Sequence, residues 1–290
     1  MSGSPEVGPS AARLRGSASA NLHALFRAMT ALDGGVLEEG GVISRHLCFP
    51  TNPMFKGAWA TRLPAGHEAD AIAETIAWFR DRDAPYFFWW QDSDAVPADL
   101  GARLQAAGLI GMEEQQKELA HGIIQKATGA PVMTMDLAAA DEAIPRRVPA
   151  GYEMRLVENA DALMAFKRVF VETYEIPEWA GQAWVDATLA FGIADAPWRI
   201  YVGWLEGDPV ATCILFNGGG FASVYAIATV AKARGAGIGA AITLAPLLIA
   251  REEGHRYATL FSTEMGMPVY ERIGFRDTGA RLDRYLWRAG

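Results

Sequence analysis

Residues 231–241 read Ala-Lys-Ala-Arg-Gly-Ala-Gly-Ile-Gly-Ala-Ala, with glycines alternating at positions 235, 237 and 239. The sequence before this segment predicts a strand over 221–230, and the sequence after it predicts a helix over 237–253. A glycine-rich loop between a strand and a helix N-terminus exposes several backbone N–H groups to one anion. Arg234 adds a positive charge beside them. The segment therefore predicts a phosphate-binding loop.

Three interpretations of this loop compete. The first is a flexible turn before a glycine-rich helix start. The second is a dinucleotide site, because Gly235-x-Gly237-x-x-Ala240 fits a permissive G-x-G-x-x-G/A pattern. A doubly wound sheet needs several more crossovers, and only one strand–helix–strand unit follows the loop, which disfavours this interpretation. The third is the motif Arg/Gln-x-x-Gly-x-Gly/Ala, matched from Arg234 to Gly239.

A second motif, Tyr-Glu-Arg-Ile-Gly-Phe over 270–275, follows this loop. The order of expected elements over about 150–290 is β-α-α-β-β-β-α-β-α-β. With both motifs in this order, the segment resembles the GNAT superfamily of N-acetyltransferases. The resemblance implies an acetyl-CoA site in which the strand before the loop pairs with the pantetheine arm and the loop amides hold the pyrophosphate. It also implies that strand 257–262 splays from its neighbour. The cofactor-binding residues implied in this way are Ile227, Ala228, Val230, Arg234, Gly235, Ala236, Gly237, Ile238, Gly239 and Ala240.

Tyr270 takes the position that the resemblance gives to the general acid. A phenol with a pKa near ~10 can protonate a thiolate within hydrogen-bond reach. The alternative is an aromatic residue that only packs its helix on the sheet. Members of the superfamily often carry a catalytic Glu on the strand before the loop, but residues 221–230 contain no acidic residue. Glu264 is our candidate base; a solvated loop carboxylate or a water relay are the alternatives.

The acceptor amine is left open as a small molecule or a peptide. The segment 172–184 combines acidic and aromatic residues that would attract a cationic amine. An amphipathic helix surface with core aromatics explains the same pattern. These residues are Glu172, Tyr174, Glu175, Glu178, Trp179 and Trp184.

The first half resembles a degenerate copy of the same fold. Strand, helix, strand, helix and strand are expected over 55–62, 68–80, 86–91, 98–107 and 132–137, after an amphipathic helix that includes residues 22–29. The segment Leu104-Gln-Ala-Ala-Gly-Leu is similar to the second motif with Leu in place of Tyr, but the loop at 63–68 has only one glycine. We therefore expect a flexible tail over 1–16, a degenerate GNAT-like domain over 17–144, a linker over 145–150 and a GNAT acetyltransferase domain over 151–290.

The expected fold class is α/β: tandem GNAT-like domains with a central mixed, mostly antiparallel sheet flanked by helices. The expected function is an acetyl-CoA-dependent N-acetyltransferase, with a non-catalytic acyl-CoA-binding sensor or scaffold as the alternative. Asp161 is the expected cap of the helix that starts near residue 160.

The composition and net charge of the chain limit the kinds of partner that it is expected to bind. The chain has 290 residues, 51% of them hydrophobic, and carries 34 Asp and Glu against 26 Lys and Arg, for a net charge of −8. This charge disfavours nucleic-acid binding. The longest apolar run, 240–250, is too short to cross a membrane.

Two cysteines and scattered histidines predict no metal site, with His46, His67 and His121 expected to be exposed or cap-bonded. The start predicts no signal peptide, so we expect a cytoplasmic protein.

Overall fold

The computed structural model describes residues 8–48, 55–112, 129–263 and 265–289. The predictions for Glu264 and His121 fall outside these ranges. The strands are β1 (Val36–Glu39), β2 (Ser44–Leu47), β3 (Lys56–Trp59), β4 (Tyr86–Gln91), β5 (Ala130–Asp136), β6 (Tyr152–Leu156), β7 (Trp198–Leu205), β8 (Asp208–Gly218), β9 (Phe221–Thr229), β10 (Tyr257–Phe261) and β11 (Arg276–Arg288). The helices are α1 (Ala11–Arg15), α2 (Ser17–Met29), α3 (Glu68–Arg80), α4 (Leu100–Ala106), α6 (Ala160–Tyr174), α7 (Glu178–Phe191), α8 (Ile238–Glu252) and α9 (Met267–Ile273), with 3₁₀ turns η2 (Leu137–Ala139), η3 (Ile144–Arg146) and η4 (Ala231–Ala233).

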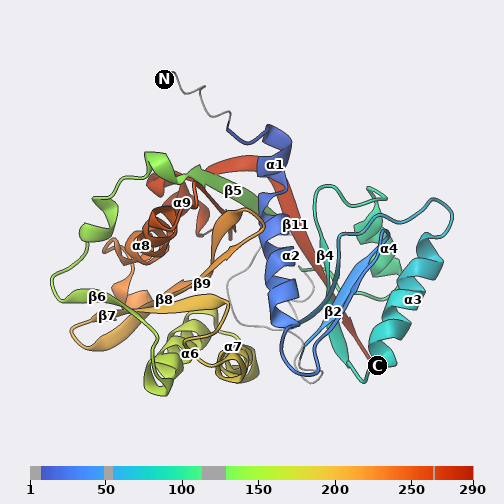
Figure 1. Cartoon of the computed structure of the whole chain (residues 1–290), viewed down its shortest axis with the longest axis horizontal. Helices are drawn as coiled ribbons and strands as arrows, with labels where there is room; N and C mark the ends of the chain where they lie inside the picture. Colours follow the sequence, from blue (N-terminus) through green and yellow to red (C-terminus); the bar gives the residue numbers. More distant parts are fainter. Residues whose placement is uncertain (1–7, 49–54, 113–128, 264, 290) are drawn as a thin grey trace.

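All these strands form one 11-stranded mixed sheet in the order β1-β2-β3-β4-β11-β5-β10-β9-β8-β7-β6. The pairs β3–β4 and β9–β10 are parallel, and the others are antiparallel. In the second half, α6 and α7 cover one face and α8 and α9 cover the other (Figure 1). The predicted α/β class, with a mostly antiparallel sheet between helices, is therefore confirmed.

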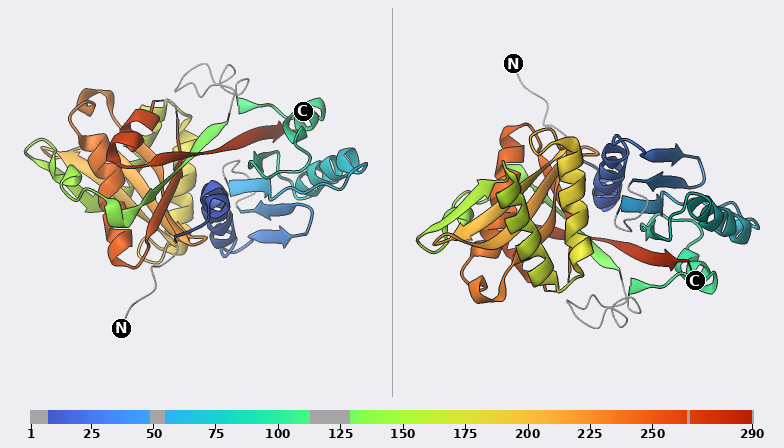
Figure 2. Two further views of the ribbon diagram at one scale, coloured as in Figure 1. Left: turned by 90° about the horizontal axis from the view of Figure 1, so that it is seen from above. Right: turned by 90° about the horizontal axis from the view of Figure 1, so that it is seen from below.

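Three elements join the two halves of the sheet. Strand β11 pairs with β5 near its start and with β4 over Asp283–Arg288, so that it runs from one half into the other (Figure 2). Strand β5 precedes the expected linker in sequence, yet it lies between β10 and β11. Helix α2 lies between the halves and packs against β8, β9 and β10.

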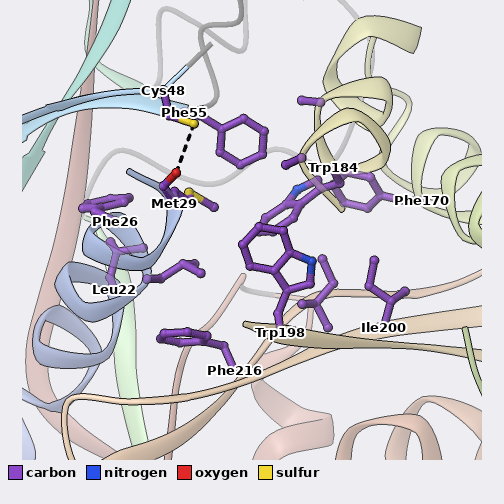
Figure 3. Packing of buried hydrophobic residues seen from close by; sticks show 14 of the residues in the cluster. Leu22, Phe26, Met29, Cys48, Phe55, Phe170, Trp184, Trp198, Ile200 and Phe216 are labelled. Atoms are coloured by element: carbon purple, nitrogen blue, oxygen red, sulfur yellow. Dashed lines mark hydrogen bonds between the residues drawn. The ribbon is translucent and has the colours of Figure 1, made fainter. Parts of the chain in front are cut away.

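A shared core fills the space between α2 and the face that carries α7. Leu22 and Phe26 of α2, Trp184 of α7, and Trp198 and Phe216 of the sheet are all buried in one apolar cluster (Figure 3). Trp184 meets both Phe55 and Trp198 edge to face, with ring centroids 5.3 and 5.5 Å apart. Because side chains from distant parts of the sequence share this core, α2 stabilises the sheet of the second half.

Several sequence predictions are confirmed in detail. The helix at 68–80 and the strands at 86–91 and 152–156 have the expected bounds, and the element order after residue 150 is as predicted. The aromatic strand β4 is buried, as its composition suggested: Phe87, Phe88 and Trp89 are at most 7% exposed. Strands β1 and β2 were not predicted, and β11, the last strand of the expected order, has 13 residues.

Three predictions are wrong. The expected flexible tail contains α1, because the Ser10 Oγ atom accepts a hydrogen bond from the Arg13 N–H at 3.2 Å and caps this helix. Asp161 does not cap α6; the Asn159 Oδ1 atom accepts from the Ala162 N–H at 2.9 Å, because Asn159 has the extended backbone of a cap residue. His46 is fully buried and not exposed, because its ring stacks on Phe26 of α2.

None of the helices in the described ranges has the length and apolar character that a membrane crossing requires.

Candidate active site

The glycine-rich loop connects β9 to α8 through the turn η4. Gly235 and Gly237 have φ values of +79° and +81°, a region that favours glycine. A Cβ atom at position 237 would lie 2.3 Å from the Arg147 carbonyl oxygen, so the loop also needs glycine there for close packing. Gly237 is the N-cap residue of α8. The predicted loop is thus fixed by backbone geometry against the segment around Arg147.

The loop presents unpaired backbone donors. Among the described residues, no backbone oxygen accepts a hydrogen bond from the N–H groups of residues 235–240. They include the first turn of α8, where the helix dipole favours an anion. The Arg234 Nε atom donates to the Thr229 carbonyl oxygen at 3.0 Å, which ties its guanidinium to the end of β9. This arrangement suits an anionic group such as a phosphate.

The strand before the loop is bent by a β-bulge. Thr212 pairs with Ala228 and Ile214 pairs with Tyr225, so two residues of β9 face the single residue Cys213. Ala226, within the bulge, has a φ value of +48°. The parallel pairing of β9 with β10 covers only Ala222 and Ser223. The rest of β9 therefore separates from β10, as the resemblance implied.

A cavity of about 540 Å³ opens at this separation. The predicted cofactor-binding residues that line it are Ile227, Ala228, Arg234, Gly235, Gly237, Gly239 and Ala240. Val230 and Ile238 are buried in the core below α8 and contribute no lining, and Ala236 is also not part of the wall. The structure thus brings most of the predicted residues to one cavity.

Tyr270 of α9 lines the same cavity and is only 9% exposed. Burial raises its pKa well above 10, and the neighbouring Tyr174 and Cys213 add to this shift. The phenol is therefore protonated at neutral pH. Helix α9 has a defined start and end. Just before it, the Gly266 N–H donates to the Thr263 Oγ1 atom at 3.0 Å, and Gly274 ends the helix with a φ of +113°. These two ends place Tyr270 beside the separation of β9 from β10.

Tyr174, at the end of α6, reaches the cavity from a different helix. Its hydroxyl donates a hydrogen bond to the Ile227 carbonyl oxygen at 2.8 Å, and burial raises its pKa to about 12. Of the expected acidic and aromatic acceptor pocket, Tyr174 lines the cavity, whereas Trp184 is buried in the shared core. Trp179 is 48% exposed, away from the lining. The predicted acceptor group therefore does not form one pocket.

Other lining residues were not predicted as site residues. They are Thr173, Thr229, Thr243, Thr263, Met265, Gly266, Val269 and Arg272. Val269 and Arg272 lie three residues apart within α9, and this spacing is the signal in the sequence that would have placed both on one side of the helix; Met265 precedes its start. Among the described lining residues there is no Asp, Glu or His. Across the described ranges, no cluster of His, Cys, Asp and Glu has the arrangement of a metal site.

Comparison with solved structures gives the fold. The chain is similar to a GCN5-related N-acetyltransferase from Kribbella flavida, with 20% identity and a TM-score of 0.66 over 98% of each chain. It is also similar to a tandem GNAT protein from the clavulanic acid biosynthesis pathway, with 14% identity and a TM-score of 0.55 over 94% of this chain and 96% of that one. This chain has the tandem GNAT fold. No protein-family model and no curated protein matches the sequence.

A third similar structure, a GCN5-related N-acetyltransferase from Sphaerobacter thermophilus, is 14% identical with a TM-score of 0.57, covering 97% of this chain and 95% of that chain.

Each half of the sheet contains one parallel pair of strands: β3–β4, joined through α3, and β9–β10, joined through α8. Helix α3, however, has Glu68 and Asp70 in its first turn. These carboxylates would repel an anion at the position where α8 offers free amides.

Proposed function

We propose that the chain is an acetyl-CoA-dependent N-acetyltransferase that moves an acetyl group to a primary amine of a small molecule or a peptide. The observation that carries this proposal is the single cavity at which the loop 234–239, the free edge of β9 and the Tyr270 hydroxyl meet. An anion-binding loop and a buried proton donor on one cavity suit the transfer of an acyl group from a phosphorylated carrier.

The residues present fit the coenzyme. The free amides of 235–240 and the Arg234 guanidinium would hold the pyrophosphate. The edge of β9 from Ile227 to Thr229 faces the gap without a partner in β10, so its backbone can pair with the amides of the pantetheine arm. Arg234 and Arg272 are the charged residues among the described lining, so the cavity is locally positive although the chain carries a net charge of −8.

The chemistry follows from Tyr270. When bound, acetyl-CoA supplies an activated acyl group as a thioester. Tyr270 holds its proton at Oη because burial keeps the phenol neutral, and it can donate that proton to the departing sulfur. The acceptor nitrogen loses a proton as it attacks the carbonyl carbon. Glu264 remains our candidate base, and a water relay is the alternative.

A non-catalytic acyl-CoA sensor or scaffold is the second candidate. The observation that favours it is the lack of any Asp, Glu or His among the described residues of the cavity wall. Such a protein would bind the coenzyme through the same loop and β9 edge, and Tyr270 would then only pack α9 on the sheet.

We further propose that the protein works in the cytoplasm without nucleic-acid or membrane partners. Its two cysteines, Cys48 and Cys213, are both buried and unpaired, which suits a reducing compartment. The net charge of −8 opposes binding to phosphate backbones and to anionic lipid surfaces.

Calorimetric titration with acetyl-CoA tests both candidates, since both require binding. Release of free thiol over a panel of primary amines, from polyamines and amino sugars to peptide N-termini, then separates them. Turnover with any amine supports the enzyme. Binding without turnover across the panel supports the sensor, and a chain that binds no acetyl-CoA excludes both.

A further inference from the structure

Two tyrosine hydroxyls form hydrogen bonds at the bulge of β9. The Tyr174 hydroxyl bonds to the Ile227 carbonyl oxygen, and the Tyr225 hydroxyl bonds to Asn21 of α2. We propose that Tyr174 and the Tyr225–Asn21 pair are positioning residues for the acyl-CoA site. Helix α2, from the N-terminal half, would then help to shape a site whose lining comes from the second half. This inference rests on the proposed function, because it assigns these residues to the binding of acetyl-CoA.

The bulge is a conformation that needs support. Ala226 has a φ of +48°, which residues other than glycine, Asn and Asp rarely adopt. Such a conformation persists only where its surroundings fix it. If the bulge flattened, the register would slip by one residue, and Ile227 to Thr229 would turn a different edge to the cavity. The geometry of the cavity wall thus depends on whatever holds residues 226 and 227.

The first contact comes from α6. The Tyr174 hydroxyl donates to the Ile227 carbonyl oxygen at 2.8 Å, directly at the bulge. The Tyr174 ring is itself fixed by an edge-to-face contact with Phe170, with centroids 5.1 Å apart. The bond is partly buried, at the point where the Tyr174 side chain lines the cavity.

The second contact comes from α2. Tyr225 lies one residue before Ala226, and its hydroxyl donates to the Asn21 Oδ1 atom at 2.5 Å. Asn21 is fully buried, and its Nδ2 atom donates to the carbonyl oxygens of Phe216, Gly218 and Phe221 at 3.3, 3.0 and 2.9 Å. Three carbonyl acceptors leave only one orientation for the amide, so Oδ1 must face Tyr225. Asn21 therefore holds β8 and β9 on both sides of the turn between them, and it also holds the side chain of the residue before the bulge.

The test uses Tyr174→Phe and Tyr225→Phe in the full chain, since each removes one hydroxyl and keeps the ring. Tyr152→Phe is the matched control, because its buried hydroxyl in β6 has no hydrogen-bond partner among the described residues and lies outside the cavity. We expect each site variant to raise the dissociation constant of acetyl-CoA about fivefold, the usual effect of one lost hydrogen bond. We also expect faster amide hydrogen exchange at residues 226–229 without ligand, and no change in either quantity for the control.

A second-site variant separates positioning from general damage. Glycine adopts a positive φ without strain, so Ala226→Gly in the Tyr174→Phe background should restore most of the acetyl-CoA affinity. If the wild-type chain binds acetyl-CoA and the two site variants bind it equally well, the positioning role is wrong while the proposed function stands. Weakened binding that Ala226→Gly does not restore also overturns it. If the wild-type chain binds no acetyl-CoA, the proposed function itself fails.

Discussion

The phenol of Tyr270 combines burial with access to the cavity, which is what a proton donor to sulfur requires. Replacing it by Phe keeps the packing on Phe275, whose ring centroid lies 6.2 Å away, and removes only the proton. We expect Tyr270→Phe to lower kcat for thiol release about 100-fold, within the usual range for general acid catalysis, with little change in KM for acetyl-CoA.

The pH profile sharpens the test. Because burial raises the Tyr270 pKa well above 10, the wild-type kcat should show no fall from tyrosine ionisation between about pH 7 and pH 10. Tyr201→Phe, in the core and outside the cavity wall, is the control and should keep its kcat. Undiminished turnover by Tyr270→Phe would remove Tyr270 from the acid role and leave it a packing residue.

Gly237 tests the anion-binding loop. An Ala side chain there is strained by the φ of +81° and would meet the Arg147 carbonyl oxygen at 2.3 Å, so the loop must shift. We expect Gly237→Ala to raise the acetyl-CoA dissociation constant at least about tenfold in a calorimetric titration, because the loop amides lose their common direction.

Gly207→Ala is the matched control for this substitution. Gly207 has a φ of +90° in the turn between β7 and β8, and apart from its two chain neighbours no described residue has an atom within 4 Å of the position that a Cβ would take. The substitution should cost about 1 kcal/mol of stability and leave acetyl-CoA binding unchanged. Equal affinity in the Gly237 variant would show that the loop does not hold the ligand.

At the scale of elements, hydrophobic periodicity and glycine signals were enough to predict most helices and strands. Helix α3 and strand β6 have the predicted bounds because their apolar spacing and their stop signals agree. The loop before α8 was predictable for the same reason. Strands β1 and β2 were missed because they are only four residues long and β1 is largely exposed, so they carry little periodic signal.

Contacts between distant elements could not be predicted from local pattern. Asn21 and Tyr174 take their roles from partners 204 and 53 residues away in the sequence. The burial of His46 has the same origin. Its ring stacks on Phe26 at 4.1 Å, and its Nδ1 atom accepts a hydrogen bond from the Trp59 Nε1 atom at 3.2 Å. Phe26 of α2 and Trp59 of β3, which are distant from each other in the sequence, both lie against this histidine.

Two histidines, His23 of α2 and His46 of β2, predict that the protein loses stability in acid. Burial lowers the pKa values of His23 and His46 from 6.5 to about 3. The unfolded chain therefore binds two protons that the folded chain excludes, so stability is fully present above about pH 6.5 and is lost as pH falls toward 3. Together the two groups contribute a slope of up to ~2.7 kcal/mol per pH unit.

Urea unfolding between about pH 6.5 and pH 5 measures this slope. His46→Asn keeps an acceptor for Trp59 but cannot be protonated, so we expect the slope to fall by up to ~1.4 kcal/mol per pH unit. His67→Asn, at an exposed position before α3, is the control and should leave the slope as it is. A slope that is the same in all three proteins would contradict the burial of a neutral His46.

At the scale of the whole molecule, one continuous sheet joins the two halves, and its strands do not follow the order of the chain. Strand β5 lies before residues 145–150, yet its residues 132–136 pair with the whole of β10, from Tyr257 to Phe261. Helix α2 covers the apolar face that includes Trp198 and Phe216. The second half alone would therefore expose both an unpaired β10 edge next to the cavity and a large apolar surface.

We accordingly expect a fragment of residues 145–290 to lack a cooperative thermal transition and to bind no acetyl-CoA. Co-expression with residues 1–144 should restore both properties, because β5 and α2 then return to their places between β10 and β11 and over the shared core. Calorimetry and acetyl-CoA titration of the fragment, the co-expressed pair and the full chain measure this. A fragment that melts sharply and binds with the affinity of the full chain would show that β5 and α2 are dispensable. The Asn21 contact could then no longer be held to position the site, since the fragment lacks it.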